Sequence, residues 1–332
     1  MHRVYRDYFV EVLGDVLTSS KFSTHEFNEE VLPAIRGEYE QVASIPSVFG
    51  FDVLTQTAYR QRGLGASLFA SPASPIAAND ATSYGRAAFS KSNIAVLGTG
   101  VEVSKLSSLV SKYFASVPAN SIGLAAGPSI YHGGEQRIAF APHHAKSSRS
   151  GNGHFFLGFQ ATPTPEFAVL RSLLGGESSV KWSSGLSPLS RISNKVNGAS
   201  AEAFNIAFSD SGLCGAYISA PHLSLQLVAK EVGNAFKSAA SSVDSEDLQR
   251  AIAKAKFEAA SALESRESMR DIVGSALLSQ KGEVKALDKV FSQLESVSAT
   301  QVSSAAQKAL KGKVTTVAIG DVHVLPYADD VL

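Results

Sequence analysis

His25 and Glu26 are the residues that come nearest in this chain to the pattern of a zinc-binding helix. In the HExxH and HxxEH motifs, two imidazoles on one helical face bind zinc and a neighbouring glutamate activates water. The sequence contains neither motif, and the position one turn after His25 is Glu29. Because this face offers only one imidazole, we interpret the pair as part of an acidic first helical turn, which the helix dipole favours.

Other reactive side chains also lack the companions that catalysis needs. His143 and His144 are adjacent in a basic stretch, and neighbouring side chains point apart, so we expect an exposed polar loop rather than a shared metal. Cys214 is the only cysteine, which excludes an intrachain disulfide and fits a reducing compartment. Its apolar neighbours predict a buried structural thiol rather than a nucleophile. There is no G-x-S-x-G nucleophile elbow.

The stretch LGGESSVKWSSGLSPLSR at residues 174–191 contains the only tryptophan, Trp182. It is not a Walker loop, because no G-K-[ST] follows at the required spacing. Two interpretations stay open: a flexible loop after a helix, or a contact loop whose tryptophan anchors on a partner. In the second, the candidate contacts with the partner are Trp182, Lys181 and Glu177.

Composition excludes several classes of function. The 332 residues include 30 basic and 30 acidic side chains, so charge gives no case for nucleic acid or an anionic membrane as partner. No apolar run is long enough to span a bilayer. The N-terminal segment carries Asp7, Glu11 and Asp15, whereas a mitochondrial presequence is poor in acidic residues. We therefore expect residues 2–18 to form a folded amphipathic helix.

One unit occurs twice along the chain. Residues 91–101 read KSNIAVLGTGV and residues 313–322 read KVTTVAIGDV, so each apolar stretch runs to a glycine, Gly98 or Gly320. Their spacing exceeds the number of residues before Gly98. If the unit marks a tandem duplication, the chain holds about one and a half repeats, and we expect it to begin in mid-domain.

Hydrophobic periodicity and turn residues predict the elements that must position these side chains. The predicted helices are 2–18, 24–43, 47–60, 80–89, 103–115, 165–175, 223–240, 245–263, 266–280 and one that begins after Ser298 and ends at Gly312. The predicted strands are 93–98, 136–141, 153–161, 201–209, 212–220 and 314–319. Capping boxes at Ser23 with Glu26 and at Ser298 with Gln301 start two of the helices. Pro33 should kink or restart the second helix.

These elements predict an α+β fold of two related halves, each an antiparallel-rich sheet packed with helices, with the first half incomplete. We expect the first domain at 1–117, a Gly- and Pro-containing linker at 118–134 and the second domain at 135–332.

The duplicated unit, NGASAEAFNIAFSDSGLCGAYISA (197–220) and AIGDVHVLPYADDVL (318–332) resemble the mitochondrial processing peptidase (pitrilysin-type) superfamily. The resemblance covers nearly the whole chain, and within the superfamily it looks most like the core protein 2 subunits of ubiquinol–cytochrome c reductase, respiratory complex III. It implies two peptidase-like halves facing each other across a cavity.

The resemblance also implies a role without catalysis. Active members hold zinc with an inverted HxxEH motif and a later glutamate; Glu38 falls at that glutamate position and is vestigial here, so no metal is expected. Core subunits hold no haem or iron–sulfur cluster, so no cofactor is expected. The implied partners are core protein 1, cytochrome b and cytochrome c1 in a dimeric complex, on the matrix side of the mitochondrial inner membrane. The alternatives are a noncatalytic alpha-type subunit of the processing peptidase, or the remnant of a zinc metalloendopeptidase.

Overall fold

The computed structural model describes residues 6–119, 127–140, 151–176, 185–279 and 284–332. The chain divides into two compact units, each assembled from separate segments. The first unit comprises residues 1–39, 70–126 and 264–284, and the second comprises 40–69, 127–263 and 285–332. Residues 40–69 therefore belong to the same compact unit as the C-terminal half. The domain boundaries expected from the sequence stay a prediction.

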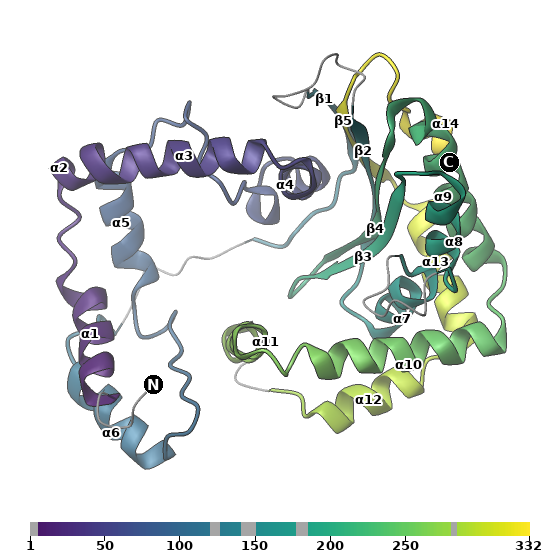
Figure 1. Cartoon of the computed structure of the whole chain (residues 1–332). Helices are drawn as coiled ribbons and strands as arrows, with labels where there is room; N and C mark the ends of the chain where they lie inside the picture. Colours follow the sequence, from purple (N-terminus) through teal and green to yellow (C-terminus); the bar gives the residue numbers. More distant parts are fainter. Residues whose placement is uncertain (1–5, 120–126, 141–150, 177–184, 280–283) are drawn as a thin grey trace. The chain divides into compact units, whose positions relative to one another are not determined.

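A five-stranded mixed sheet is the centre of the second unit (Figure 1). Its strands are β1 (Gly134–Ala139), β2 (Asn152–Ala161), β3 (Ser200–Ala207), β4 (Gly212–Pro221) and β5 (Val314–Gly320), in the order β1-β5-β2-β4-β3. β1 runs parallel to β5, and the other neighbours are antiparallel. The hairpin predicted at Asp210 and Ser211 is confirmed, since β3 and β4 pair on either side of it and Phe208 N–H donates to the Ser211 carbonyl at 2.9 Å.

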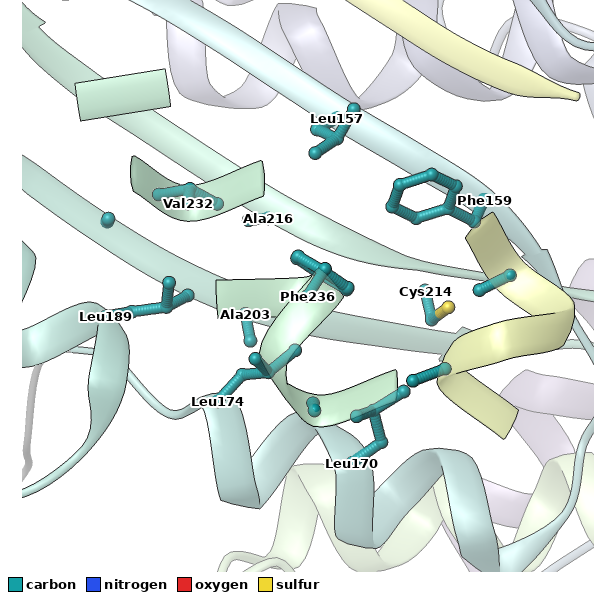
Figure 2. Packing of buried hydrophobic residues seen from close by; sticks show 14 of the residues in the cluster. Leu157, Phe159, Leu170, Leu174, Leu189, Ala203, Cys214, Ala216, Val232 and Phe236 are labelled. Atoms are coloured by element: carbon teal, nitrogen blue, oxygen red, sulfur yellow. The ribbon is translucent and has the colours of Figure 1, made fainter. Parts of the chain in front are cut away.

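Helices cover both faces of this sheet, which explains why β2 is an almost unbroken apolar run. Phe155, Leu157 and Phe159 point to one face and join the main core, whereas Phe156 points to the other. Figure 2 shows Leu157 and Phe159 in this main core, with Phe236 and Cys214. The elements that complete the second unit are α4 (Pro46–Tyr59), η3 (Gly63–Gly65), α7 (Pro165–Leu174), α8 (Pro188–Lys195), α9 (His222–Ser241), α10 (Ser245–Ser261), α12 (Leu287–Glu295), α13 (Ala299–Lys311) and α14 (Ala328–Val331).

Among the described helices, α4 covers the opposite face of the sheet (Figure 1). Val53 and Leu54 pack there against Phe156 and against Val317 and Ile319 of β5. At Gly50 the helix comes so close that an added Cβ would lie 2.1 Å from the Phe156 ring. The small residue is therefore required for this helix to reach the sheet.

The first unit is helical in its described residues. It contains α1 (Arg6–Ser19), α2 (Thr24–Glu26), the π-helical turn η2 (Phe27–Val31), most of α3 (Leu32–Ala43), α5 (Ala78–Ala88), α6 (Val103–Tyr113) and α11 (Arg266–Ser279). α1 and α6 meet at Gly14, where an added Cβ would lie 2.5 Å from the Tyr113 carbonyl oxygen. The Ser23 cap is confirmed, since its hydroxyl accepts from Glu26 N–H at 3.4 Å. The helix restarts next to Pro33, whose missing N–H leaves the α-helical ladder incomplete there.

One predicted strand is wrong. Residues 94–98 form no regular structure, and every strand in the described chain lies in the sheet of the second unit. The stretch has the composition of a strand, but a strand forms only where another strand satisfies its backbone groups. The α+β class is confirmed, as are the other predicted strands and helices, with ends shifted by a few residues. The sequence interpretation missed the helices α8, α12 and α14. No described helix combines the length and the apolar composition needed to cross a membrane.

Candidate functional site

Glu38, which the sequence resemblance assigns to the metal-binding glutamate position, lies on an exposed helical surface. Glu38 lies on the solvent side of α3, and His25 Nδ1 lies 3.0 Å from Glu29 Oε1 one turn later on another exposed surface. Across the described ranges, no three His, Cys, Asp or Glu side chains gather in a way that could hold a metal ion. Glu38 therefore has no companion ligands in that part of the chain.

Cys214 is confirmed as a buried structural thiol. It lies in β4 opposite Phe159 and is 3% exposed. Burial raises the pKa of this thiol to about 12, because the thiolate would lose its solvation. The thiol therefore stays protonated at neutral pH and is not a nucleophile.

The predicted partner contacts Trp182, Lys181 and Glu177 lie outside the described residues, as do His143 and His144. The partner-contact role of the tryptophan loop therefore stays a prediction. The residues on either side of the undescribed part are described, and both are hydrogen-bonded to serines at the start of α8. Gly176 N–H donates to Ser187 Oγ at 3.2 Å, and Gly185 N–H donates to Ser190 Oγ at 2.6 Å.

The two glycines that follow α7 allow the chain to approach the edge strand of the sheet. Gly175 has a φ of +73°, and an added Cβ would lie 2.3 Å from Ser187 Cβ. At Gly176 an added Cβ would lie 2.7 Å from Glu202 Cα. The Gly175 carbonyl accepts a hydrogen bond from Ala203 N–H of β3 at 2.8 Å. These glycines thus have a structural role in this chain, because they let the segment after α7 pack closely against β3.

A groove of about 490 Å³ opens beside the edge strand β3. One wall is β3, with Phe204 of that strand, Phe51 of α4 and Tyr217 of β4, and the other is formed by α7, α10 and α12. Phe51 makes edge-on contacts with Phe204, with ring centroids 5.0 Å apart. This groove combines an apolar interior with a strand edge and a few polar groups, as binding sites commonly do.

Ionic side chains stand at one side of this groove. Arg171 pairs with Glu258 and lies 3.8 Å from a carboxylate oxygen of Glu202. Its Nε also donates to the Ala203 carbonyl at 3.3 Å, and Ser172 Oγ donates to Glu258 at 3.2 Å. The guanidinium is therefore held by partners on both α10 and β3.

On the α4 face of the sheet, His154 stacks on Tyr217 with almost parallel rings, and 2.8 Å separates His154 Nδ1 from the Tyr217 hydroxyl. Burial, with a smaller contribution from His222, lowers the pKa of His154 to about 4. His154 is therefore neutral at physiological pH, and the pair forms a hydrogen-bonded aromatic surface rather than a charged site.

The sequence interpretation did not single out Arg171, Asn205 or Tyr217. Alternation along β3 could have placed Asn205 on the same face as Ala201 and Ala203. That β3 is an edge strand beside a groove follows only from the strand order.

Comparison with known proteins identifies the class of protein that has this fold. The family described as "Peptidase M16 inactive domain" matches residues 75–255. The chain belongs to the peptidase M16 family.

Comparisons that cover nearly the whole of this chain narrow the class. The chain is 39% identical to cytochrome b-c1 complex subunit 2 of Cryptococcus neoformans, over 98% of this chain and 73% of the relative. It is 36% identical to the protein of the same name from Neurospora crassa, over 97% of this chain and 70% of the relative. A chain of complex III2 from Candida albicans, with Inz-5 bound, has the same fold, with a TM-score of 0.83 at 14% identity over 99% of this chain and 80% of that one. Within its family the chain thus groups with the mitochondrial cytochrome b-c1 complex subunit 2 proteins.

Proposed function

We propose that the chain is a noncatalytic core subunit of the cytochrome b-c1 complex, respiratory complex III. The observation that carries this proposal is the 39% identity to a cytochrome b-c1 complex subunit 2 over 98% of the chain. The matching family model is described as the inactive domain of peptidase M16, which supports a role without catalysis. The absence of HExxH and HxxEH from the sequence and the exposed position of Glu38 agree with it.

The partners follow from the same assignment. Core protein 1, cytochrome b and cytochrome c1 are the chains that this subunit would contact, as a peripheral protein on the matrix side of the mitochondrial inner membrane. The subunit would hold no redox group itself, and its contribution would be to the assembly and stability of the complex.

The test is to tag the chain in the organism it comes from and to purify it in a mild detergent. We expect the tagged chain to elute with b-type and c-type haem absorbance and with ubiquinol–cytochrome c reductase activity. Recovery without haem proteins, together with presequence-cleaving activity, would instead assign the chain to the processing peptidase as an alpha-type subunit.

We also propose that Trp182, with Lys181 and Glu177, contacts one of these partners. A tryptophan in an otherwise small and polar stretch is a frequent interface anchor, and its truncation often costs about 2 kcal/mol or more of binding free energy. Trp182→Ala should therefore leave the melting temperature of the isolated chain nearly unchanged and reduce the haem recovered with the tagged chain. Trp182→Phe should retain most of the haem. A large drop in melting temperature with normal haem recovery would make Trp182 a core residue instead.

A further inference from the structure

Among the described residues, the outer edge of β3 has hydrogen-bond partners along its first half and none along its second. Ala201 N–H donates to Ser193 Oγ of α8 at 2.9 Å, and Ala203 bonds the Gly175 carbonyl and the Arg171 side chain. In the register with β4, the backbone groups of alternate residues face away from the sheet, so those of Asn205 and Ala207 also face outward. No described residue bonds these outward groups. An uncovered strand edge is a template for another extended chain.

The groove of about 490 Å³ lies directly beside this edge. Between α10 and α12 it is lined by small and aliphatic side chains, Ala255, Ala259, Val290 and Leu294. A strand added to β3 would direct every second side chain toward this lining, because side chains alternate along a strand. An edge strand facing a helix across an apolar groove is the arrangement by which proteins capture extended peptides.

Asn205 lines this groove and has hydrogen-bonding capacity that no described residue uses. Its Oδ1 is buried, and no described residue donates to it. A buried acceptor without a donor destabilises the fold, so a bound chain that supplies an N–H to this amide would relieve the cost.

The charges at the groove favour a basic occupant. Glu202 and Glu258 line it together with one cation, Arg171, so among the described lining residues carboxylates exceed cations. Arg171 is engaged mainly by Glu258, whereas the Glu202 side chain is 53% exposed and its contact with Arg171 is 3.8 Å long. Glu202 is thus available to a positive charge from outside.

We propose that this groove binds an extended segment of a partner chain by adding a strand to β3. The segment pairs with the backbone of Asn205 and Ala207, places an apolar side chain between α10 and α12, and carries a lysine or arginine beside Glu202. This interaction is separate from the assignment to the cytochrome b-c1 complex and concerns a surface of the second unit only.

The probe is a fluorescein-labelled octapeptide of alternating valine and threonine that ends in lysine, titrated against the complete purified chain. Binding should weaken about tenfold or more when the probe's alternate backbone amides are N-methylated, because methylation removes the donors that pair with a strand edge. A probe ending in glutamate in place of lysine should also bind more weakly.

Two variants test the site on the protein. Asn205→Pro removes an outward N–H, which an edge strand tolerates, together with the side-chain amide, and should weaken the lysine probe about tenfold or more. Glu202→Lys should weaken the lysine probe and strengthen the glutamate probe. Asp329→Lys, the same charge change on α14 and away from the groove lining, should leave both affinities unchanged. Circular dichroism of each variant verifies that it is folded.

The proposal is overturned if no probe binds at millimolar concentration, or if folded Asn205→Pro and Glu202→Lys bind the lysine probe like the unmodified chain. It is also overturned if the chain dimerises in gel filtration and both variants make it monomeric, because the occupant would then be a second copy of this chain.

Discussion

At the residue scale, two adjacent threonines of β5 both have a buried hydroxyl, but these hydroxyls differ in their hydrogen bonding. Thr315 and Thr316 are at most 1% exposed. The Thr315 hydroxyl lies 2.7 Å from the Tyr131 hydroxyl, whereas Thr316 Oγ1 has no hydrogen-bond partner among the described residues. A paired buried hydroxyl stabilises a fold and an unpaired one destabilises it.

Substitution of each threonine by valine, which has nearly the same shape, separates these two effects. We expect Thr316→Val to raise the free energy of unfolding by about 1 kcal/mol, because it removes an unsatisfied polar atom. Thr315→Val should lower it by about 1 kcal/mol, because one hydrogen bond of the buried Tyr131 hydroxyl is lost, although its bond to the Lys313 carbonyl remains. Urea unfolding followed by circular dichroism measures both, and the same sign for the two variants would contradict this account.

His154 makes the stability of the second unit depend on pH. Its pKa is about 4 in the folded protein, against 6.5 for an unperturbed histidine. Between these values the unfolded chain binds a proton that the folded chain does not, so stability falls as the pH is lowered from about 6.5 toward 4 and this loss ends below 4. The shift corresponds to a loss of at most roughly 3 kcal/mol, less where solvent reaches the ring.

The measurement is the urea midpoint at several pH values for the unmodified chain and for His154→Gln. Carboxyl groups titrate in the lower part of this range in both proteins, so the difference between the two curves isolates the histidine. We expect the difference in stability between the unmodified chain and His154→Gln to become smaller as the pH falls from 7 to 4. A gap that is constant with pH would show that His154 does not titrate differently in the two states.

At the element scale, α4 has an unusual position because its sequence neighbours α3 and α5 lie mainly in the first unit. Its apolar side chains nevertheless cover the face of the sheet that the other helices leave open. Leu54 is fully buried there, and an added Cβ on Gly158 of β2 would lie 3.3 Å from a Leu54 methyl carbon. The helix is thus an integral layer of the second unit.

Leu54→Ala should therefore destabilise the second unit by about 2–5 kcal/mol, the usual cost of a cavity at a leucine in a protein core. Val48→Ala is the control on the same helix, since Val48 is 44% exposed, and it should change stability by less than about 0.5 kcal/mol. Cys214 offers an independent readout, because its buried thiol reacts with a thiol reagent only when the sheet opens. Equal effects of the two variants would mean that α4 is not part of the folded core.

At the scale of the whole molecule, the chain passes between the two units several times, so no single boundary in the sequence divides one unit from the other. Residues 71–77 form an exposed segment without helix or strand, shortly after the portion that belongs to the second unit. Exposed segments of this kind are preferred sites of proteolytic cleavage.

Limited proteolysis within residues 71–77 should therefore cut the chain between α4 and the sheet, while α4 stays packed on the sheet. We expect the fragment containing residues 40–69 to elute with the fragment containing 127–263 in native gel filtration and to separate from it in urea. In Leu54→Ala this fragment should dissociate more readily. If the two fragments of the unmodified chain elute apart without denaturant, α4 is only loosely attached to the sheet.

The sequence by itself determined the features that depend on neighbours along the chain. Ser298 with Gln301 caps a helix because the two side chains satisfy nearby N–H groups, and the structure has that box, with Ser298 N–H donating to Gln301 Oε1 at 2.8 Å. Asp210 and Ser211 mark a hairpin because they interrupt two strands with complementary alternation. The motif at 197–220 resembles the peptidase M16 family, to which the chain belongs.

Tertiary structure decided what depends on partners distant in the chain. The apolar stretch at 93–98 has the local character of a strand but no strand beside it, whereas the similar stretch at 314–319 pairs with β1 and β2. Likewise, nothing in the sequence of α4 shows which sheet it covers, and nothing in β3 shows that the described residues leave half of its edge unpaired. Local propensity and capping act over a few residues, but burial and strand pairing are satisfied only when the whole chain has brought the two partners together.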